Sequence, residues 1–271
     1  MNPQAVELLA AGAEEGGGGG LHFPPISHLL EWPAILFDGT VFALNKTGII
    51  YLWAMLAPVV LFTLAIRRSA MVPTGVQTIA ESSVTFVRDD IVMQTMGPDG
   101  MKFMPFLMSL FFFIFFANIT EVFPFIHFPA NARMAAPASL AIIVWLVFNG
   151  VGIKSQGLFG YFKNTVIPPG VPGALLPLVA LIELVSTFLV RPFSLAVRLF
   201  ANMLAGHLLL VTFGVLTATL WTTDWLAVLL PLPFVVLIGL TGFEILVAFL
   251  QAFIFTILTA VYIGGALHPE H

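Results

Sequence analysis

Two long apolar segments near the C-terminus, residues 174–218 and 228–267, constrain the fold of this chain more than any other feature. Each exceeds the roughly 20 residues that a helix needs to cross the hydrocarbon core of a bilayer. Both segments nevertheless carry ionisable side chains, namely Glu183, Arg191, Arg198, His207 and Glu244. A charge at the centre of a membrane helix costs about 2.5–3.5 kcal/mol on insertion scales, so several of them together indicate a path for ions.

The composition also favours a membrane protein. Hydrophobic residues make up 59% of the 271-residue chain and charged residues only 9%, compared with roughly 25% charged residues in soluble domains. The net charge of −4 provides no basic face for nucleic acid. The chain has no cysteine, which excludes disulfides and thiolate metal ligands. It also has no G-x-x-x-x-G-K-[ST] loop, so we expect neither a nucleotide nor a cofactor in this chain.

The hydropathy pattern predicts an all-α polytopic membrane protein. Five stretches are long enough to span a bilayer, at about 48–66, 103–123, 136–153, 174–218 and 228–267. Between the first two, residues 75–97 mix charges with apolar residues at helical spacing, a pattern typical of an interfacial amphipathic helix. The last two stretches exceed one perpendicular crossing and contain prolines, so we expect a long, tilted helical hairpin.

The chain divides into two parts by composition. Residues 1–45 are acidic and Gly-rich and lack the pattern of a cleaved signal, so we expect an N-terminal extracytoplasmic segment. Residues 46–271 would form the transmembrane ion-channel domain. With the N-terminus outside, the inner loops hold most of the basic residues: Arg67, Arg68, Arg88, Lys102, Lys154 and Lys163. The positive-inside rule therefore predicts an outer N-terminus and a cytoplasmic C-terminus.

A polar stripe follows the fourth span at helical spacing. It comprises Glu183, Thr187, Arg191, Ser194, Arg198, Asn202 and Ala205. Such a stripe can face a water-lined cleft or another protein but not lipid. Two structural alternatives remain open: Arg198 could simply pair with Glu183 or with a carboxylate of a loop, and Arg191 could extend to the inner interface.

The fifth span carries a matching stripe, comprising Thr241, Glu244, Ala248, Gln251, Phe255, Thr259 and Tyr262. Counting outward from a turn near Asp224 places Arg198 level with Gln251, and His207 level with Glu244. A histidine beside a glutamate in a low dielectric favours proton exchange, because each affects the ionisation of the other. The alternative is that both are buried polar residues without a role in transport.

The segments RPFSLAVRLFANMLAGH and GFEILVAFLQAFIFTILTAVYI resemble subunit a of F-type ATP synthase. The resemblance implies that Arg198 is the essential arginine of that family, that Asn202 is the asparagine after it, and that Gln251 is the conserved glutamine. His207 and Glu244 would occupy paired positions at which some members exchange glutamate and histidine.

A shorter segment, ANITEVFP, resembles the outer-channel segment of the same family. It would place Asn118 and Glu121 in a proton inlet, although an N-x-x-E pattern also occurs at ordinary helix ends. Glu183 would line an inner exit, with Arg191 and Ser194 in support.

The resemblance further implies a proton-conducting stator subunit in a bacterial plasma membrane. It would lie beside the c-ring, contact the peripheral-stalk subunit b, and offer two offset half-channels without binding nucleotide or acting as an enzyme by itself. A self-contained proton-coupled secondary transporter is the main alternative, although the chain lacks the internal repeats of many transporters. A purely structural membrane scaffold is another, and the choice between H⁺ and Na⁺ stays open.

Overall fold

The computed structural model describes residues 45–67, 72–123, 128–167, 171–172, 175–221 and 225–267. These residues form helices and no strand, which confirms the predicted all-α class. Five helical stretches are long and apolar enough to cross a membrane: Lys46–Arg67, Gly97–Ile119, Ala135–Gln156, Leu176–Thr219 and Ala227–Leu267. They overlap the five predicted spans. Apart from Asn45, the predicted N-terminal segment lies outside the described residues, as does the predicted turn at Asp224.

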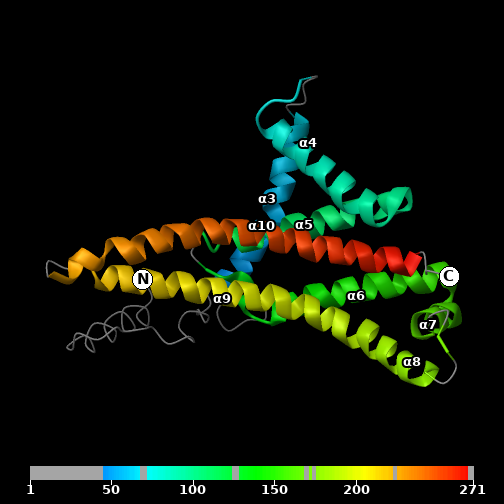
Figure 1. Ribbon diagram of the computed structural model, residues 1–271. Helices are drawn as coiled ribbons and strands as arrows, with labels where there is room; N and C mark the ends of the chain where they lie inside the picture. Colours follow the sequence, from blue (N-terminus) through cyan, green and yellow to red (C-terminus); the bar gives the residue numbers. More distant parts are fainter. Residues whose placement is uncertain are drawn as a thin grey trace.

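The C-terminal half forms the predicted helical hairpin. Helices α9 (Arg191–Thr219) and α10 (Pro231–Leu267) lie side by side along most of their lengths (Figure 1). The 37 residues of α10 correspond to a length of about 55 Å. This exceeds the roughly 30 Å thickness of a bilayer core, so the hairpin fits a membrane only when it is strongly tilted.

The fourth span contains a wide helical turn that the sequence analysis did not foresee. Helix α8 (Leu176–Val185) leads through a π-helical turn, η4 (Ser186–Val190), into α9. Pro192 follows this turn and has no N–H to donate to the preceding turn, and its ring crowds the carbonyl four residues before it. A wider turn relieves that crowding. The regular spacing assumed for the polar stripe therefore fails here, and Glu183 is rotated relative to Arg198.

The other spans surround the hairpin. Helices α5 (Met104–Ile119) and α6 (Ala135–Gln156) pack against α10, and α6 also packs against α9. Helix α3 (Lys46–Arg67) packs against α5 and crosses the hairpin at a steep angle (Figure 1). The predicted amphipathic segment forms α4 (Val76–Phe86) and the π-helical η1 (Val87–Met93), followed by the 3₁₀ segment η2 (Gly97–Phe103).

The core lies where α5, α6, α9 and α10 meet. Its fully buried members include Leu107, Phe148, Leu199, Phe255 and Ile263. Neighbouring phenylalanines of α3, α5 and α10 add ring contacts with centroids 5.2–6.4 Å apart, within the range of favourable aromatic pairs. In a bilayer, such close packing takes over the role of the hydrophobic effect, because lipid is as apolar as the side chains.

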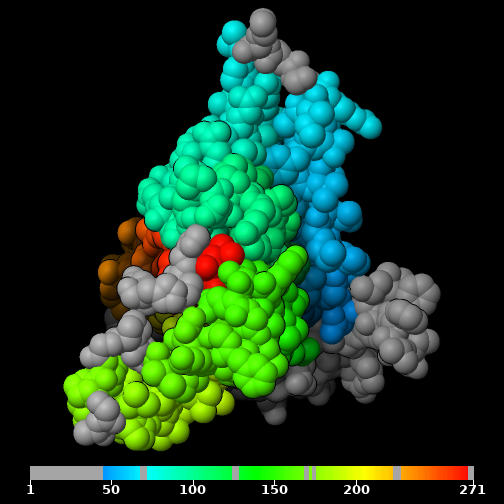
Figure 2. Space-filling model, turned by 90° about the vertical axis from the view of Figure 1, so that its right-hand side faces the viewer, coloured from blue at the N-terminus to red at the C-terminus, as the bar shows by residue number. Residues whose placement is uncertain are grey.

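The C-terminal end of α10 is enclosed by other elements. Figure 2 shows this end between the α4–η2 segment and α6. Gln156 Nε2 donates a 2.9 Å hydrogen bond to the carbonyl oxygen of Ala266. The connecting helix α7 (Leu158–Val166) lies against α6, where the Tyr161 ring covers Gly152. The C-terminal end of α10 is thereby fixed against the rest of the fold.

Candidate functional site

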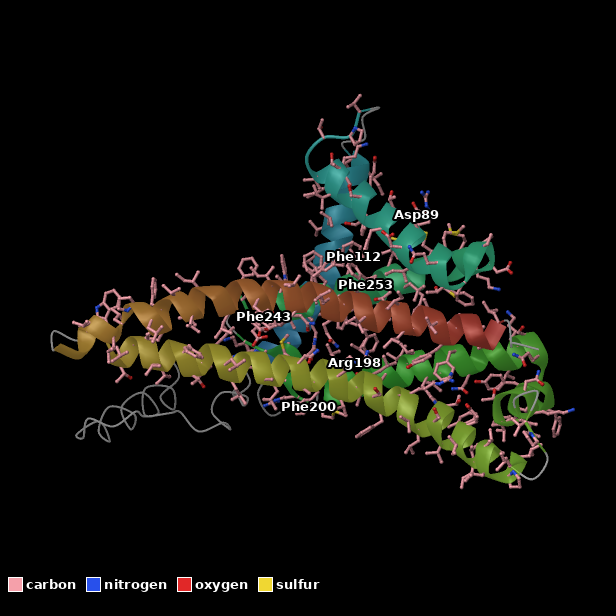
Figure 3. All side chains as sticks on the ribbon, in the orientation of Figure 1. Asp89, Phe112, Arg198, Phe200, Phe243 and Phe253 are labelled. Carbon is pink, nitrogen blue, oxygen red and sulfur yellow. The ribbon has the colours of Figure 1, made fainter. Side chains whose placement is uncertain are left out.

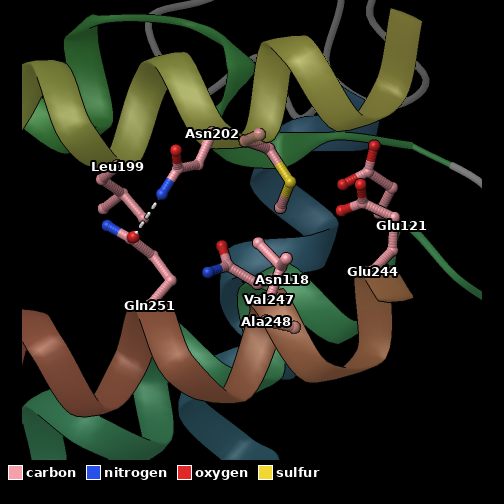
Figure 4. A pocket seen from close by; sticks show the side chains of 9 residues that line it. Asn118, Glu121, Leu199, Asn202, Glu244, Val247, Ala248 and Gln251 are labelled. Carbon is pink, nitrogen blue, oxygen red and sulfur yellow. Dashed lines mark hydrogen bonds between the residues drawn. The ribbon is translucent and has the colours of Figure 1, made fainter. Parts of the chain in front are cut away.

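A small cavity lies between the end of α5 and the two helices of the hairpin (Figure 4). The cavity volume accessible to water is about 10 Å³, which is enough for about one water molecule. Polar side chains make up more than half of its lining, which consists of Asn118, Glu121, Leu199, Asn202, Met203, Glu244, Val247, Ala248 and Gln251. Five of these residues were candidate site residues in the sequence. The fold thus brings together groups from three separate helices.

A hydrogen bond between α9 and α10 closes one side of the cavity. Asn202 Nδ2 donates to Gln251 Oε1 at 2.7 Å (Figure 4). Gln251 is 2% exposed, and within the described part of the chain its Nε2 has no hydrogen-bond partner. Asn202, by contrast, lies on the exposed side of α9. This pair connects the surface of the hairpin with its buried interior.

This hydrogen bond links Gln251 to the residue one helical turn after Arg198. The facing ends of α9 and α10 are equidistant from residue 225, close to the turn that the count assumed. The contact of the Glu244 carboxyl group with Gly206 agrees with that count, whereas the hydrogen bond of Gln251 departs from it by about one turn.

Two carboxyl groups and an imidazole lie at the other side of the cavity. Glu121 is 1% exposed, His207 3% and Glu244 5%. Glu121 Oε1 lies 3.4 Å from His207 Nδ1, and the Glu244 carboxyl group lies against Gly206, next to His207 in the chain. The hairpin therefore places His207 and Glu244 in one region, and the end of α5 adds Glu121 to them.

The loop before α6 contributes an asparagine that the sequence analysis missed. Asn131, in the 3₁₀ turn η3 (Ala130–Ala132), is fully buried, and its Nδ2 donates to Asn118 Oδ1 at 2.7 Å. The two asparagines lie on different elements, so no periodic spacing links them. The only signal in the sequence was a polar residue within an apolar loop.

Arg198 does not line this cavity, although it lies on α9 one helical turn before Asn202. Figure 3 labels it midway along the hairpin. Arg198 is half-buried, and the neighbouring Asn202 and Ala205 are exposed. Among the described residues no carboxylate forms an ion pair with it, so the structure gives no support to a structural pair with Glu183. This part of the polar stripe faces outward, as it would toward another protein.

The three remaining candidates lie on α8 and at the start of α9, before Arg198 in the chain. The Arg191 guanidinium carbon lies 5.2 Å from the centre of the Tyr262 ring, a cation–π distance. Glu183 and Ser194 are both half-buried, and neither lines the cavity. Within the described ranges, no group of three His, Asp or Glu side chains could hold a metal ion.

Comparison with known proteins identifies the family. The family model described as ATP synthase A chain matches residues 49–264. Proteins named ATP synthase subunit a are similar to this chain: that of Parvibaculum lavamentivorans is 43% identical over 97% of this chain and 100% of its own length. That of Rhodococcus erythropolis is 40% identical over 92% and 91%, and that of Frankia alni 43% identical over 84% and 79%. Together with its five apolar helices, this similarity shows that the chain is a multi-pass membrane protein that belongs to the ATP synthase subunit a family.

Proposed function

We propose that this chain is the proton-conducting stator subunit of the membrane sector of an ATP synthase. It offers two offset half-channels to a ring of c subunits and couples proton transfer to rotation of that ring. The observation that supports this best is the buried cluster around the cavity, which leads to the side of α9 that carries Arg198. No ion pair with Arg198 occurs within the described part of the chain. In this assignment, the N-terminus lies outside and the C-terminus in the cytoplasm.

The outer half-channel uses the cluster at the end of α5. Protons arrive near Asn118 and Glu121 and pass to His207 and Glu244, which share the buried region beside the cavity. A lone charge is costly in such surroundings. An imidazole and two carboxyl groups beside one another therefore offer successive binding sites for a proton that passes through this region. Asn202 and Gln251 then connect the cavity to the exposed side of α9.

The exposed side of α9 is the surface offered to the c-ring. Each ring subunit would carry a carboxyl group that is protonated while it faces lipid, because an unpaired charge there is costly. Arg198 keeps its charge at any relevant pH, so it favours the ionised form of a carboxylate that reaches it. The same fixed charge blocks direct proton passage between the two half-channels.

The inner half-channel leads along α8 and the start of α9. Glu183 and Ser194 are half-buried there, and Arg191 is held over Tyr262. A proton released from the ring would leave past these groups. Moving one charge across the membrane contributes about 2.3 kcal/mol per 100 mV, which would drive rotation and ATP formation in the rest of the complex. Subunit b would hold this chain stationary.

Replacement of Arg198 tests this assignment. We expect Arg198→Ala to abolish proton-driven ATP synthesis in membrane vesicles, whereas ATP hydrolysis by the detached soluble head stays normal. Arg198→Lys should also fail largely, because a desolvated ammonium deprotonates more readily and lacks the planar fork of a guanidinium. The matched control is Lys163→Ala, which removes an exposed charge on α7, outside the spans. Normal ATP synthesis by Arg198→Ala would refute the proposal, and solute uptake by the purified chain would favour a transporter instead.

A further inference from the structure

We infer that Tyr51 and Asn131 are positioning residues for the inlet, because they fix the side-chain amide of Asn118 so that it donates into the cavity. The inference rests on the proposed function, and it concerns two residues that lie outside the cavity lining. They form a chain of contacts from α3, through the loop before α6, to the last turn of α5.

Tyr51 attaches this loop to α3. Its hydroxyl oxygen lies 2.8 Å from the carbonyl oxygen of Ala130 and 3.1 Å from Asn131 Oδ1. A phenol has one hydrogen to donate, so these two acceptors share it. The Tyr51 ring is itself held by stacking on Phe113 of α5, with centroids 5.8 Å apart. The hydroxyl group therefore has a fixed position relative to both α3 and α5.

Asn131 transmits this position to Asn118. Its amide oxygen accepts from Tyr51, which identifies the other end of the amide as the NH₂ group. That group donates to Asn118 Oδ1 at 2.7 Å. Asn131 is fully buried and Asn118 is 4% exposed, so water does not compete freely for these bonds. A flip of either amide would place two donors or two acceptors opposite each other.

The consequence for the cavity is a defined donor. Because the oxygen of Asn118 is engaged by Asn131, its amide N–H groups remain for the space between α9 and α10, into which the side chain reaches (Figure 4). Glu121 and Glu244 line the same cavity, and both offer acceptor oxygens. An oriented donor beside them holds a water or a carboxylate oxygen in one arrangement for proton transfer, whereas a freely flipping amide does so only part of the time.

The test measures proton conduction through the assembled membrane sector. Vesicles containing the complete complex are stripped of the soluble head, a potassium diffusion potential is imposed, and proton entry is followed with a pH-sensitive dye. Tyr51→Phe removes the hydroxyl but keeps the stacked ring. We expect about threefold to tenfold slower conduction, the rate equivalent of one lost hydrogen bond, with an unchanged amount of the subunit in the membrane. Asn131→Ala should produce a similar loss.

A double-mutant cycle separates positioning from simple support of the fold. Asn118→Leu should slow conduction by itself, and adding Tyr51→Phe to it should cause no further loss, because the amide that Tyr51 orients is already gone. Tyr161→Phe is the matched control, since it removes a 3.0 Å hydrogen bond to Asn149 on α6; conduction should stay normal.

Each outcome bears on the inference. Normal conduction in Tyr51→Phe would overturn it, as would losses that multiply in the double variant, since these indicate independent effects. If Asn118→Leu conducts normally, the assignment of this cluster as the inlet is wrong, and the inference fails with it. If Arg198→Ala abolishes coupling but Tyr51→Phe has no effect, the proposed function stands and only the positioning role is lost.

Discussion

Gly206 lies where α9 approaches the Glu244 carboxyl group most closely, and its replacement gives a sharp prediction. A Cβ atom at position 206 would lie 2.5 Å from the carboxyl carbon of Glu244, where ordinary contacts begin at 3.4 Å. One of the two groups must therefore move by roughly 1 Å. The carboxyl group ends a flexible side chain, so we expect Gly206→Ala to displace Glu244 rather than to separate the helices.

The expected magnitude follows from the surroundings of Glu244. This residue is 5% exposed, so its carboxyl group can move only into a strained rotamer or away from its neighbours, at a cost of about 0.5–1.5 kcal/mol. If the displaced state must return for each proton transfer, the rate falls by about twofold to tenfold. Gly214→Ala is the control on the same helix, because a Cβ there meets no atom within 4 Å.

The assay is proton conduction through head-stripped vesicles, with the amount of assembled subunit measured in parallel. Shortening the carboxylate provides the decisive comparison. In a Glu244→Asp background, the shorter side chain leaves space for the new methyl group, so Gly206→Ala should cause no additional loss. Equal conduction by the two alanine variants would refute the reasoning. So would a Gly206→Ala loss that persists unchanged in the Glu244→Asp background.

Two further predictions concern packing and register. Gly152→Ala should destabilise the subunit by about 1–3 kcal/mol, because the new Cβ would overlap the Tyr161 ring. Gly150→Ala is the control, since a Cβ there meets no atom within 4 Å. Thermal melting of the detergent-solubilised complex compares the two variants, and equal melting midpoints would contradict the prediction. The chain has no cysteine of its own, so single cysteines at Asn202 and Gln251 can be tested with a short thiol-to-thiol reagent. The 202–251 pair should cross-link faster than a 198–251 pair. The reverse order would contradict the observed contact between Asn202 and Gln251.

The candidate site illustrates the limits of one-dimensional patterns. Helical spacing identified Asn202, Glu244 and Gln251, because each lies on a long helix with a regular period. The same method counted across residues 186–190 as if the helix were uniform, and the π-helical turn before Pro192 changes that phase. Counting from the turn agreed with the contact between Gly206 and Glu244 but did not foresee the hydrogen bond between Asn202 and Gln251.

The sequence by itself determined the all-α class, the five spans and the family. These features follow from hydropathy and from motifs within single segments, since a helix in lipid must satisfy its own backbone hydrogen bonds whatever its neighbours do. Only the tertiary structure brought Glu121 to His207, paired Asn202 with Gln251, and linked Tyr51 through Asn131 to Asn118. Such contacts depend on crossing angles, loop paths and helix phase, which arise from the packing of the whole bundle rather than from the spacing of residues in any one helix.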